Sequence, residues 1–242
     1  MLNNSKMKTE LLQHITFTGI DQYTDIARLR ELQKRFPLAE FGVLLSTDWE
    51  KNGTRFPNPV LLKELAGQDL HLSAHLCGKA AALALDGHWP WIDEIIFGGD
   101  EIRKAFRRIQ LNVSSRKDLP EILAATLPHT EIIIQQRDAD HAGLFLRSAE
   151  CMADVSVLLD ASGGRGVESP FEVRPEMKAF KVGYAGGLGP DNAASKLAEL
   201  LRNPDIGRFW IDMESRVRTD DRLDLDKVEV VLQTCYQILK QN

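Results

Sequence analysis

The sequence has few cysteines and no long apolar run. Three cysteines among 242 residues are too few, and odd in number, for a disulfide framework, so a reducing compartment is expected. No apolar stretch approaches the roughly 18 residues that span a bilayer. The polar residues 1–10 lack the apolar centre of a signal peptide. These absences predict a cytoplasmic protein without a membrane partner.

An excess of basic residues is also missing. Lys and Arg number 30 against 35 Asp and Glu, which gives a formal net charge of −5. This mild acidity argues against nucleic acid as a partner. The composition, 43% hydrophobic and 27% charged, is that of an ordinary globular protein. No linker segment divides the chain, so we expect a single domain over residues 1–242, with residues 1–12 as an N-terminal tail.

Apolar, β-branched runs of strand length recur along the chain, and amphipathic segments lie between most of them. Eight such runs can be recognised: 14–19, 40–46, 70–75, 108–113, 131–136, 155–160, 179–184 and 208–213. Eight units in this length give about 30 residues per unit, the size of one strand and one helix. Strands that alternate with helices pair in parallel. The sequence therefore predicts an α/β fold, a closed (β/α)8 TIM barrel.

An open doubly wound sheet is the rival architecture. Such a sheet usually carries a glycine-rich phosphate loop after its first strand. Here the first strand ends in Thr18-Gly19-Ile20 without that loop, and glycines cluster after the sixth and seventh runs instead. This placement favours the barrel, whose phosphate sites commonly follow strands seven and eight.

The segments between the strands carry helix signals. Asn58-Pro59 is typical of a helix start, and Gly67 of a helix end. Prolines at positions 170 and 175 predict a short or irregular helix in the sixth unit. In the third unit we expect a helix over 80–85, a break around the packing residues Trp89 and Trp91, and a second helix over 92–97.

Active sites of barrels lie at the carboxyl ends of the strands, which makes the side chains there the candidates. Side chains alternate along a strand, so the polar set of the third strand (His71, Ser73, His75 and Cys77) is predicted to point into the barrel. The other candidates are Thr18, Ser46, Gln110, Asn112, Gln135 or Gln136, Arg137, Asp160, Tyr184, Asp212, Glu214 and Ser215, with Lys51 and Arg55 in the loop after the second strand.

Asp160 ends the sixth apolar run and is followed by a glycine-rich segment. A carboxylate beside apolar walls can have a raised pKa, which suits a group that transfers protons. The alternative interpretation is a structural aspartate that caps the next turn or pairs with Arg165. We take Asp160 as the leading catalytic candidate.

The sequence Gly186-Gly187-Leu188-Gly189 after the seventh strand is typical of an anion site. Glycines let backbone N–H groups approach a phosphate, and a following helix directs its positive end toward it. Ser215 and Arg216, after the eighth strand, could complete the site through a hydroxyl and a charge. The same glycines could also form only a tight turn.

Two other clusters have structural interpretations. His71 and His75 lie four residues apart on a strand, roughly 13 Å, too far for one metal ion. We therefore expect no metal and no cofactor. Arg103, Lys104, Arg107 and Arg108 form a basic run that we interpret as a solvated helix end.

At this point the motifs resemble a known family. The run 157–160, followed by Gly163-Gly164-Arg165-Gly166 and Phe171, is similar to the sixth-strand motif of phosphoribosylanthranilate isomerase. The segment 184–192 is similar to that family's seventh-strand phosphate motif. Further similarities are Ile211-Asp212 to its final strand, residues 109–112 to its fourth strand, and residues 54–57 to its arginine loop.

The resemblance implies an activity and roles for individual residues. The family performs an Amadori rearrangement of an aminated ribose phosphate in tryptophan biosynthesis: a general acid opens the sugar ring to a Schiff base, and a general base removes a proton from the neighbouring carbon. It implies that Asp160 is the acid, and that Arg55 binds the substrate carboxylate. Asp212 would contact the amine of the substrate, and Gly186, Gly187 and Ser215 would hold its phosphate. Asn112, on the similar fourth strand, is a further candidate for substrate binding, and Arg216 remains a phosphate candidate through its charge.

The chain departs from the family on the base side. The family's first strand carries a cysteine as general base, and here Thr18 stands at that place. A threonine hydroxyl does not ionise near neutral pH and cannot replace a thiolate. Our hypothesis is that Cys77 or His75 supplies the missing base from the third strand. In the eighth-strand loop, Glu214 introduces a carboxylate where the family has a serine.

Three interpretations stay open. The first is an isomerase acting on a phosphorylated sugar. The second is another phosphosugar enzyme on the same scaffold, although no lysine ends a strand to support Schiff-base catalysis of the aldolase kind. The third is a non-catalytic protein that binds a phosphorylated small molecule. The sequence is compatible with a monomer or a homodimer.

Overall fold

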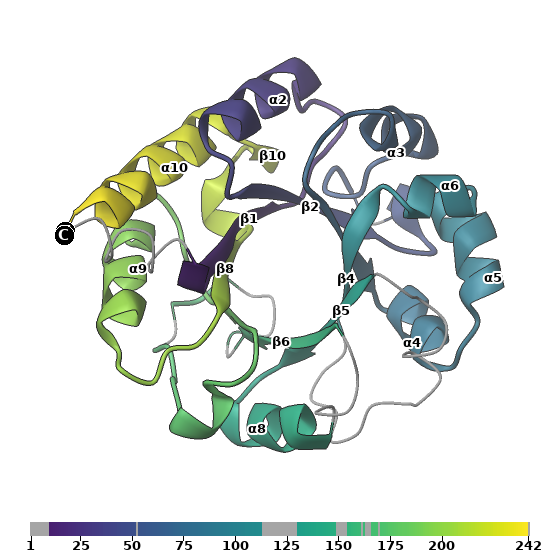
Figure 1. Cartoon of the computed structure of the whole chain (residues 1–242). Coiled ribbons are helices and arrows are strands. Elements are labelled where there is room, and N and C mark those ends of the chain that lie inside the picture. Colours follow the sequence, from purple (N-terminus) through teal and green to yellow (C-terminus); the bar gives the residue numbers. More distant parts are fainter. Residues whose placement is uncertain are drawn as a thin grey trace.

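The chain forms a closed barrel of eight parallel strands surrounded by helices (Figure 1). This computed structural model describes residues 10–51, 53–112, 130–148, 154–160, 162, 166–168 and 170–241. Each strand pairs with the next, and the first pairs with the eighth, which confirms the predicted (β/α)8 barrel. The strands are β1 (Leu12–Thr18), β2 (Ala39–Leu45), β3 (Leu72–Cys77), β4 (Phe106–Asn112), β5 (Glu131–Gln136), β6 (Val155–Asp160), β7 (Val182–Ala185) and β8 (Phe209–Met213).

The predicted strand positions are correct for all eight runs, with differences at their ends. The bounds of β5 and β6 agree with the prediction at both ends. β1 begins at Leu12, the last residue that we assigned to the tail, because Leu12 is buried in the core and pairs with Phe209. β7 begins three residues later than predicted, since residues 178–180 form a turn after a short helix.

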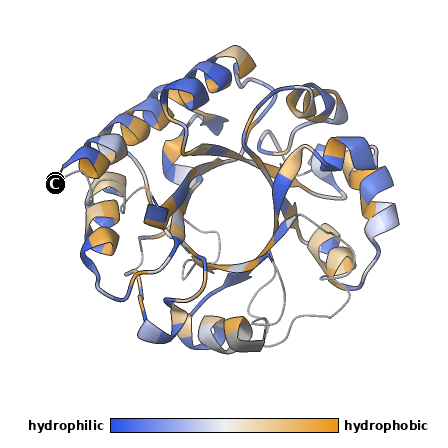
Figure 2. Cartoon of the chain, viewed as in Figure 1, coloured by the Kyte–Doolittle hydropathy of each residue, from blue (hydrophilic) through white to orange (hydrophobic). Residues whose placement is uncertain are grey.

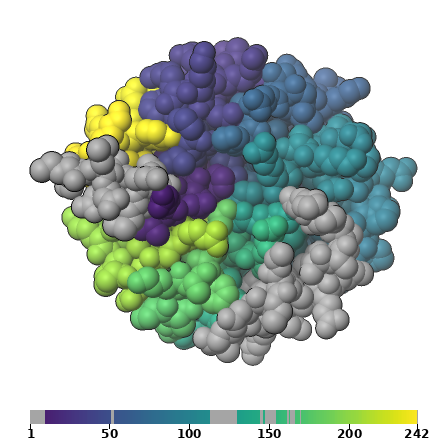
Figure 3. Space-filling view, in the orientation of Figure 1, coloured from purple at the N-terminus to yellow at the C-terminus, as the bar shows by residue number. Residues whose placement is uncertain are grey.

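The helices lie outside the barrel and bury one face each against it (Figure 2). Their apolar side chains contact the outer faces of the strands, and the space inside the ring of strands is filled by side chains (Figure 3). The α-helices are α2 (Ile26–Arg35), α3 (Pro59–Ala66), α4 (Lys79–Leu85), α5 (Trp89–Ile92), α6 (Asp100–Arg103), α8 (Ala139–Ser148), α9 (Ala193–Arg202) and α10 (Leu225–Lys240). Shorter elements are the 3₁₀-helices η1 (Trp49–Lys51), η3 (Pro175–Met177) and η4 (Ser215–Val217), the π-helix η2 (Asp93–Phe97) and the hairpin β9 (Arg218–Thr219) and β10 (Arg222–Leu223).

Local sequence signals explain where α3 and the sixth-unit helix begin and end. The Asn58 side chain accepts a hydrogen bond from the Leu61 backbone N–H, and Pro59 occupies the first helical position. The helix ends at Gly67, as predicted. Among the described residues of the sixth unit, η3 is the one helix, which confirms the expected short helix.

The third unit differs from the prediction at its break. The chain leaves the helix at residues 86–88, and Trp89 begins α5 instead of lying in the break, because Pro90 is tolerated in the first turn of a helix. Trp89 is fully buried, but Trp91 is 38% exposed, so the prediction that both are packing residues is wrong for Trp91.

The amino-terminal end of the barrel contains a buried network of charges. The Arg108 guanidinium donates to Glu40 at 2.7 Å and to Glu131 at 3.2 Å, and all three side chains come from strands. The Thr16 hydroxyl also donates to Glu40 at 2.8 Å. Our interpretation of the basic run as a solvated helix end is therefore wrong for Arg108, which is 3% exposed inside the barrel. It holds for Lys104, an exposed partner of acidic residues in α6.

None of the helices in the described part of the chain combines the length and apolar character that crossing a membrane requires.

Candidate active site

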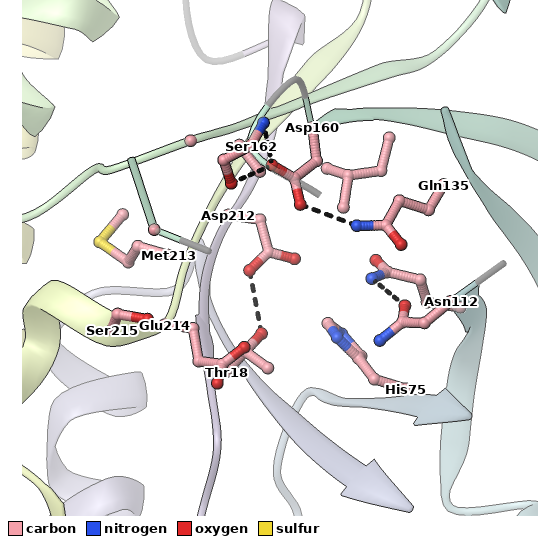
Figure 4. A pocket seen from close by; sticks show the side chains of 15 residues that line it. Thr18, His75, Asn112, Gln135, Asp160, Ser162, Asp212, Met213, Glu214 and Ser215 are labelled. Carbon is pink, nitrogen blue, oxygen red and sulfur yellow. Dashed lines mark hydrogen bonds between the residues drawn. The ribbon is translucent and has the colours of Figure 1, made fainter. Parts of the chain in front are cut away.

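A cavity opens at the carboxyl ends of the strands, at the end opposite the Arg108 network (Figure 4). This is the end at which barrels place their active sites. It brings together ten of the predicted site residues: Thr18, His75, Gln110, Asn112, Gln135, Asp160, Gly186, Asp212, Glu214 and Ser215. The remaining lining residues are Leu158, Ser162, Gly166, Ala185 and Met213.

Asp160 and Asp212 both line the cavity, from alternate strands. In the sheet register Asp160 pairs with Ala185, and Ala185 pairs with Asp212, so the two aspartates lie in one row on β6 and β8. Two strand spacings separate their backbones by about 10 Å. Both side chains are buried, at 4% and 5% exposure. The row therefore brings two buried carboxyl groups to the same side of one cavity.

The carboxylate of Asp160 is an acceptor for several donors. Its Oδ2 accepts a hydrogen bond from Gln135 Nε2 at 2.7 Å. Its Oδ1 accepts from the backbone N–H of Ser162 at 3.1 Å and from the Ser162 hydroxyl at 2.6 Å. Asp160 thus caps the turn after β6, as its structural interpretation predicted, and also lines the cavity. Arg165, the other partner considered, lies outside the described residues.

The environment of the Asp212 carboxyl group differs from that of Asp160. Its Oδ1 accepts from the Thr18 hydroxyl at 2.9 Å, while its buried Oδ2 has no hydrogen-bond partner among the described residues. Burial raises the pKa of Asp212 well above its usual value, and the Thr18 hydrogen bond opposes this only in part. Burial therefore favours the protonated, uncharged form of the Asp212 carboxyl group.

A second acceptor on the cavity wall has no partner. The side-chain amide of Gln110 donates to Asn112 Oδ1 at 2.7 Å, and its buried Oε1 accepts no hydrogen bond from any described residue. Buried polar atoms in native proteins are nearly always satisfied. Gln110 Oε1 and Asp212 Oδ2 are thus positions at which a bound ligand can complete the hydrogen bonding.

His75 points into the cavity as a neutral imidazole. It is 2% exposed, and burial lowers the pKa of His75 to about 4. Its Nε2 lies 3.1 Å from the Ser73 hydroxyl. Room for the ring comes from Gly42 on β2, since a Cβ at that position would lie 3.0 Å from Nε2 and 2.4 Å from the Thr18 hydroxyl oxygen.

Cys77 lies beside the cavity but does not line it. Its thiol donates to the His75 carbonyl and accepts from the Asn112 amide at 3.3 Å. Burial raises the pKa of Cys77 to about 11, so the thiolate is scarce at neutral pH. The contacts and the raised pKa argue against Cys77 as the missing base. The neutral imidazole of His75 is the other candidate that our hypothesis named.

The predicted phosphate residues form one loop cluster, but only part of it reaches the cavity. Gly186 and Ser215 line the cavity together with Gly166, whose Cβ, if present, would lie 2.9 Å from Ser215. Gly187, with φ of +61°, contacts the backbone of Glu168 instead. The Arg216 guanidinium donates to the Gly187 carbonyl at 2.8 Å and pairs with Asp191. Gly187 and Arg216 therefore support the loop, and neither lines the cavity.

Arg55 is held outside the cavity by two acidic side chains. Its Nη1 donates to Glu214 at 2.7 Å, and its Nε donates to Asp221 at 2.7 Å. Glu214 itself lines the cavity. The guanidinium that the resemblance assigns to a substrate carboxylate is thus already bound to carboxylates of this chain.

Some lining residues were missed, and the candidates Ser46, Gln136, Arg137 and Tyr184 do not line the cavity. Ser162 lies two positions after the end of β6. It was missed because only the residues at the strand ends were taken as candidates there. Tyr184 does not face the cavity. It packs between Phe171 and Phe209 with ring centroids 5.3 and 6.3 Å away, because its position alternates with that of Ala185.

The described residues contain no group of three or more His, Cys, Asp or Glu side chains placed to hold a metal ion. His71 and His75, the pair considered from the sequence, line different cavities, which lie at opposite ends of the barrel.

Comparisons with known proteins show a relationship in fold. No family model matches the chain. No curated protein matches it in sequence. The structure is similar to that of N-(5'-phosphoribosyl)anthranilate isomerase from Pyrococcus furiosus, with 16% identity, a TM-score of 0.56, and coverage of 93% of this chain and 99% of that one. It is also similar to TrpF from Jonesia denitrificans, with 15% identity, a TM-score of 0.58, and coverage of 95% and 100%.

Proposed function

We propose that this chain is an enzyme that isomerises a phosphorylated sugar by proton transfer, in the manner of a phosphoribosylanthranilate isomerase. The observation that carries the proposal is the pair of buried carboxyl groups, Asp160 and Asp212, that face one cavity from alternate strands. Solved structures of the same fold bear the name of that isomerase and cover nearly the whole chain. We expect the enzyme to act in the cytoplasm on a small phosphorylated substrate.

Asp212 is the group that donates a proton. Burial raises the pKa of Asp212 well above its usual value, which favours the protonated form of the carboxyl group. Because Oδ1 accepts from Thr18, the proton resides on Oδ2, the oxygen without a partner among the described residues. A carboxylic acid in this state can protonate the ring oxygen of a bound sugar.

Asp160 is the group that accepts a proton. Gln135 and Ser162 direct three hydrogen-bond donors at its two oxygens, which hold the carboxylate in place at the cavity wall. This assignment reverses the acid role that the family resemblance implies for Asp160. It also removes the need for a base on β1, where Thr18 supports Asp212 instead.

The two groups account for a balanced aldose-to-ketose rearrangement. Asp212 gives its proton to the ring oxygen, the C1–O bond breaks, and the nitrogen on C1 forms a C=N bond with its lone pair. Asp160 then takes the proton from C2, and the C–H electron pair becomes a C1–C2 double bond as the iminium nitrogen is neutralised. Tautomerisation of the resulting enol gives the ketone and returns protons to carbon and carboxyl.

The phosphate of such a substrate fits the cavity wall formed by Gly166, Gly186 and Ser215. Glycine at the first two positions leaves the backbone accessible, and Ser215 adds a hydroxyl. Recognition would then come from backbone N–H groups and a hydroxyl. Arg216 would contribute to phosphate binding indirectly, because its hydrogen bond to the Gly187 carbonyl holds the loop in place.

The test is complementation of a tryptophan auxotroph that lacks the isomerase, in parallel with an assay of the purified protein on phosphoribosylanthranilate and on other 1-amino-1-deoxyribose 5-phosphates. We expect turnover of at least one of these substrates and its loss in Asp160→Asn. Binding of all of them without turnover would favour the non-catalytic alternative. Failure to bind any of them, and failure to bind ribose 5-phosphate, would contradict the proposal.

A further inference from the structure

The arginines around the eighth-strand end of the cavity are all engaged by groups of the chain itself. Arg55 bonds Glu214 and Asp221, as described above. Arg218 is 3% exposed and donates to the Gly19 carbonyl and to Asp21 at 2.9 Å. These contacts neutralise both cations.

Arg216, the third arginine, donates to the Gly187 carbonyl and pairs with Asp191 at 3.1 Å. None of the three lines the cavity. Each guanidinium is thus oriented by an internal acceptor before any ligand arrives.

The cavity wall itself carries no positive charge in the described part of the chain. Its described lining contains no lysine and no arginine, whereas Glu214 contributes a carboxylate close to Asp160. A carboxylate brought into this region meets a guanidinium that already has two anionic partners. It also meets Glu214 directly, and like charges placed together cost binding energy.

The cavity wall offers different interactions to a phosphate and to a carboxylate. The Gly166, Gly186 and Ser215 wall can bind a phosphate without a side-chain cation. The wall near Glu214 presents carboxylate oxygen atoms, so it favours a hydroxyl, an amine or an uncharged substituent that can donate a hydrogen bond.

We propose that the site selects phosphosugars whose C1 substituent is neutral or cationic and rejects those whose substituent carries a carboxylate, with Glu214 as the residue that decides between them. This specificity rests on the proposed function. Glu214 acts in two ways: it occupies the Arg55 guanidinium, and it places its own charge on the cavity wall.

A matched pair of ligands tests the proposal. One is 1-phenylamino-1-deoxyribulose 5-phosphate, and the other is the same molecule with a carboxylate at the ortho position of the ring. Titration calorimetry gives both dissociation constants for the wild type, for Glu214→Gln and for a control, Asp226→Asn. Asp226 on α10 forms an exposed ion pair with Arg28 on α2, so the control removes one negative charge from a residue that does not line the cavity.

We expect the wild type and Asp226→Asn to bind the phenyl ligand about tenfold or more tightly than the carboxyphenyl ligand. Glu214→Gln should abolish or invert this ratio by releasing Arg55. Equal or tighter binding of the carboxyphenyl ligand by the wild type overturns the specificity alone, as does an unchanged ratio in Glu214→Gln. If neither ligand nor ribose 5-phosphate binds, the proposed function fails and the specificity fails with it.

Discussion

The Thr18 hydroxyl on β1 donates a hydrogen bond of 2.9 Å to Asp212 on β8. The two strands are neighbours in the closed barrel, although the residues lie 194 positions apart in the sequence. The bond orients the Asp212 carboxyl group. Under the proposed function, Thr18, which cannot ionise, acts through this bond by directing the proton of Asp212 toward the cavity.

Replacing this hydroxyl should change the pH dependence of the reaction. Because the Thr18 hydrogen bond lowers the pKa of Asp212, Thr18→Val should raise that pKa further. Asp212 must be protonated to act, so activity is lost as the pH rises through its pKa. We therefore expect the alkaline limb of the kcat–pH profile to move to higher pH, together with a lower kcat.

Thr16→Val is the matched control, since Thr16 lies on the same strand and its hydroxyl bonds Glu40 at the other end of the barrel. It should leave the alkaline limb where the wild type has it. An unchanged limb in Thr18→Val, with kcat also unchanged, would show that the hydroxyl does not act through Asp212.

Asp212→Asn should stabilise the protein while abolishing turnover. The pKa of Asp212 lies well above its unfolded value near roughly 4, so between the two values the folded state binds more protons than the unfolded state. The stability that this group contributes therefore falls as the pH rises through that window. Asparagine removes the titration, so the Tm of the variant relative to wild type should increase from pH 4.5 to pH 8 by about several degrees.

Thermal unfolding by circular dichroism at both pH values measures this difference. Asp226→Asn, which removes an exposed carboxylate, should show no comparable trend. A difference in Tm that stays constant with pH would mean that Asp212 is ionised in the folded protein and cannot be the proton donor.

Gly42 should tolerate no larger residue, although its backbone conformation is ordinary. A Cβ there would lie 2.4 Å from the Thr18 hydroxyl oxygen and 3.0 Å from His75 Nε2. Gly42→Ala should destabilise the fold by about 1–3 kcal/mol through overpacking and should reduce activity by displacing Thr18. Urea unfolding and kcat measure the two effects.

The control for Gly42 is Gly67→Ala at the end of α3, where the nearest atom to a new Cβ is 3.4 Å away. We expect a change within about 0.5 kcal/mol there. Equal stability of both variants would show that the Gly42 site can relax, and that its small size is not what keeps Thr18 and His75 in place.

The barrel could be predicted because its signals are local. Apolar runs and intervening helices repeat at a constant spacing, and alternation along β3 places His75 inside. Asp160, Asp212 and Gly186 were found for the same reason, since each ends or follows a strand. These positions follow from the order of elements along the chain.

The partners of the site residues could not be predicted, because they come from distant segments. The sequence alone could not show that Glu214 and Asp221 hold Arg55, or that Arg216 binds the Gly187 carbonyl. It also could not show that Arg108 lies inside the barrel, because a basic run next to acidic residues is typical of a helix surface. The acceptors that bury this arginine lie on other strands.

Arg108 should be essential for stability and not for chemistry. The pKa values of Glu40 and Glu131 fall even though burial acts to raise them, because Arg108 lies beside both carboxylates; the pKa of Glu131 is about 2. Arg108→Met leaves Glu40 buried without its cation, which should cost about 3–5 kcal/mol in the free energy of unfolding. Lys104→Met, which removes an exposed pair on α6, should change that free energy very little.

A double variant separates charge from packing at this network. Arg108→Met combined with Glu40→Gln removes the uncompensated charge, so it should recover part of the loss, and the coupling between the two sites should be measurable by urea unfolding. The Arg108 guanidinium also lies 4.3 Å from the Trp210 ring, so packing accounts for the part that is not recovered. If the double variant is as unstable as the sum of the two single variants, the ion pair does not stabilise the barrel, and the arginine acts through its contact with Trp210.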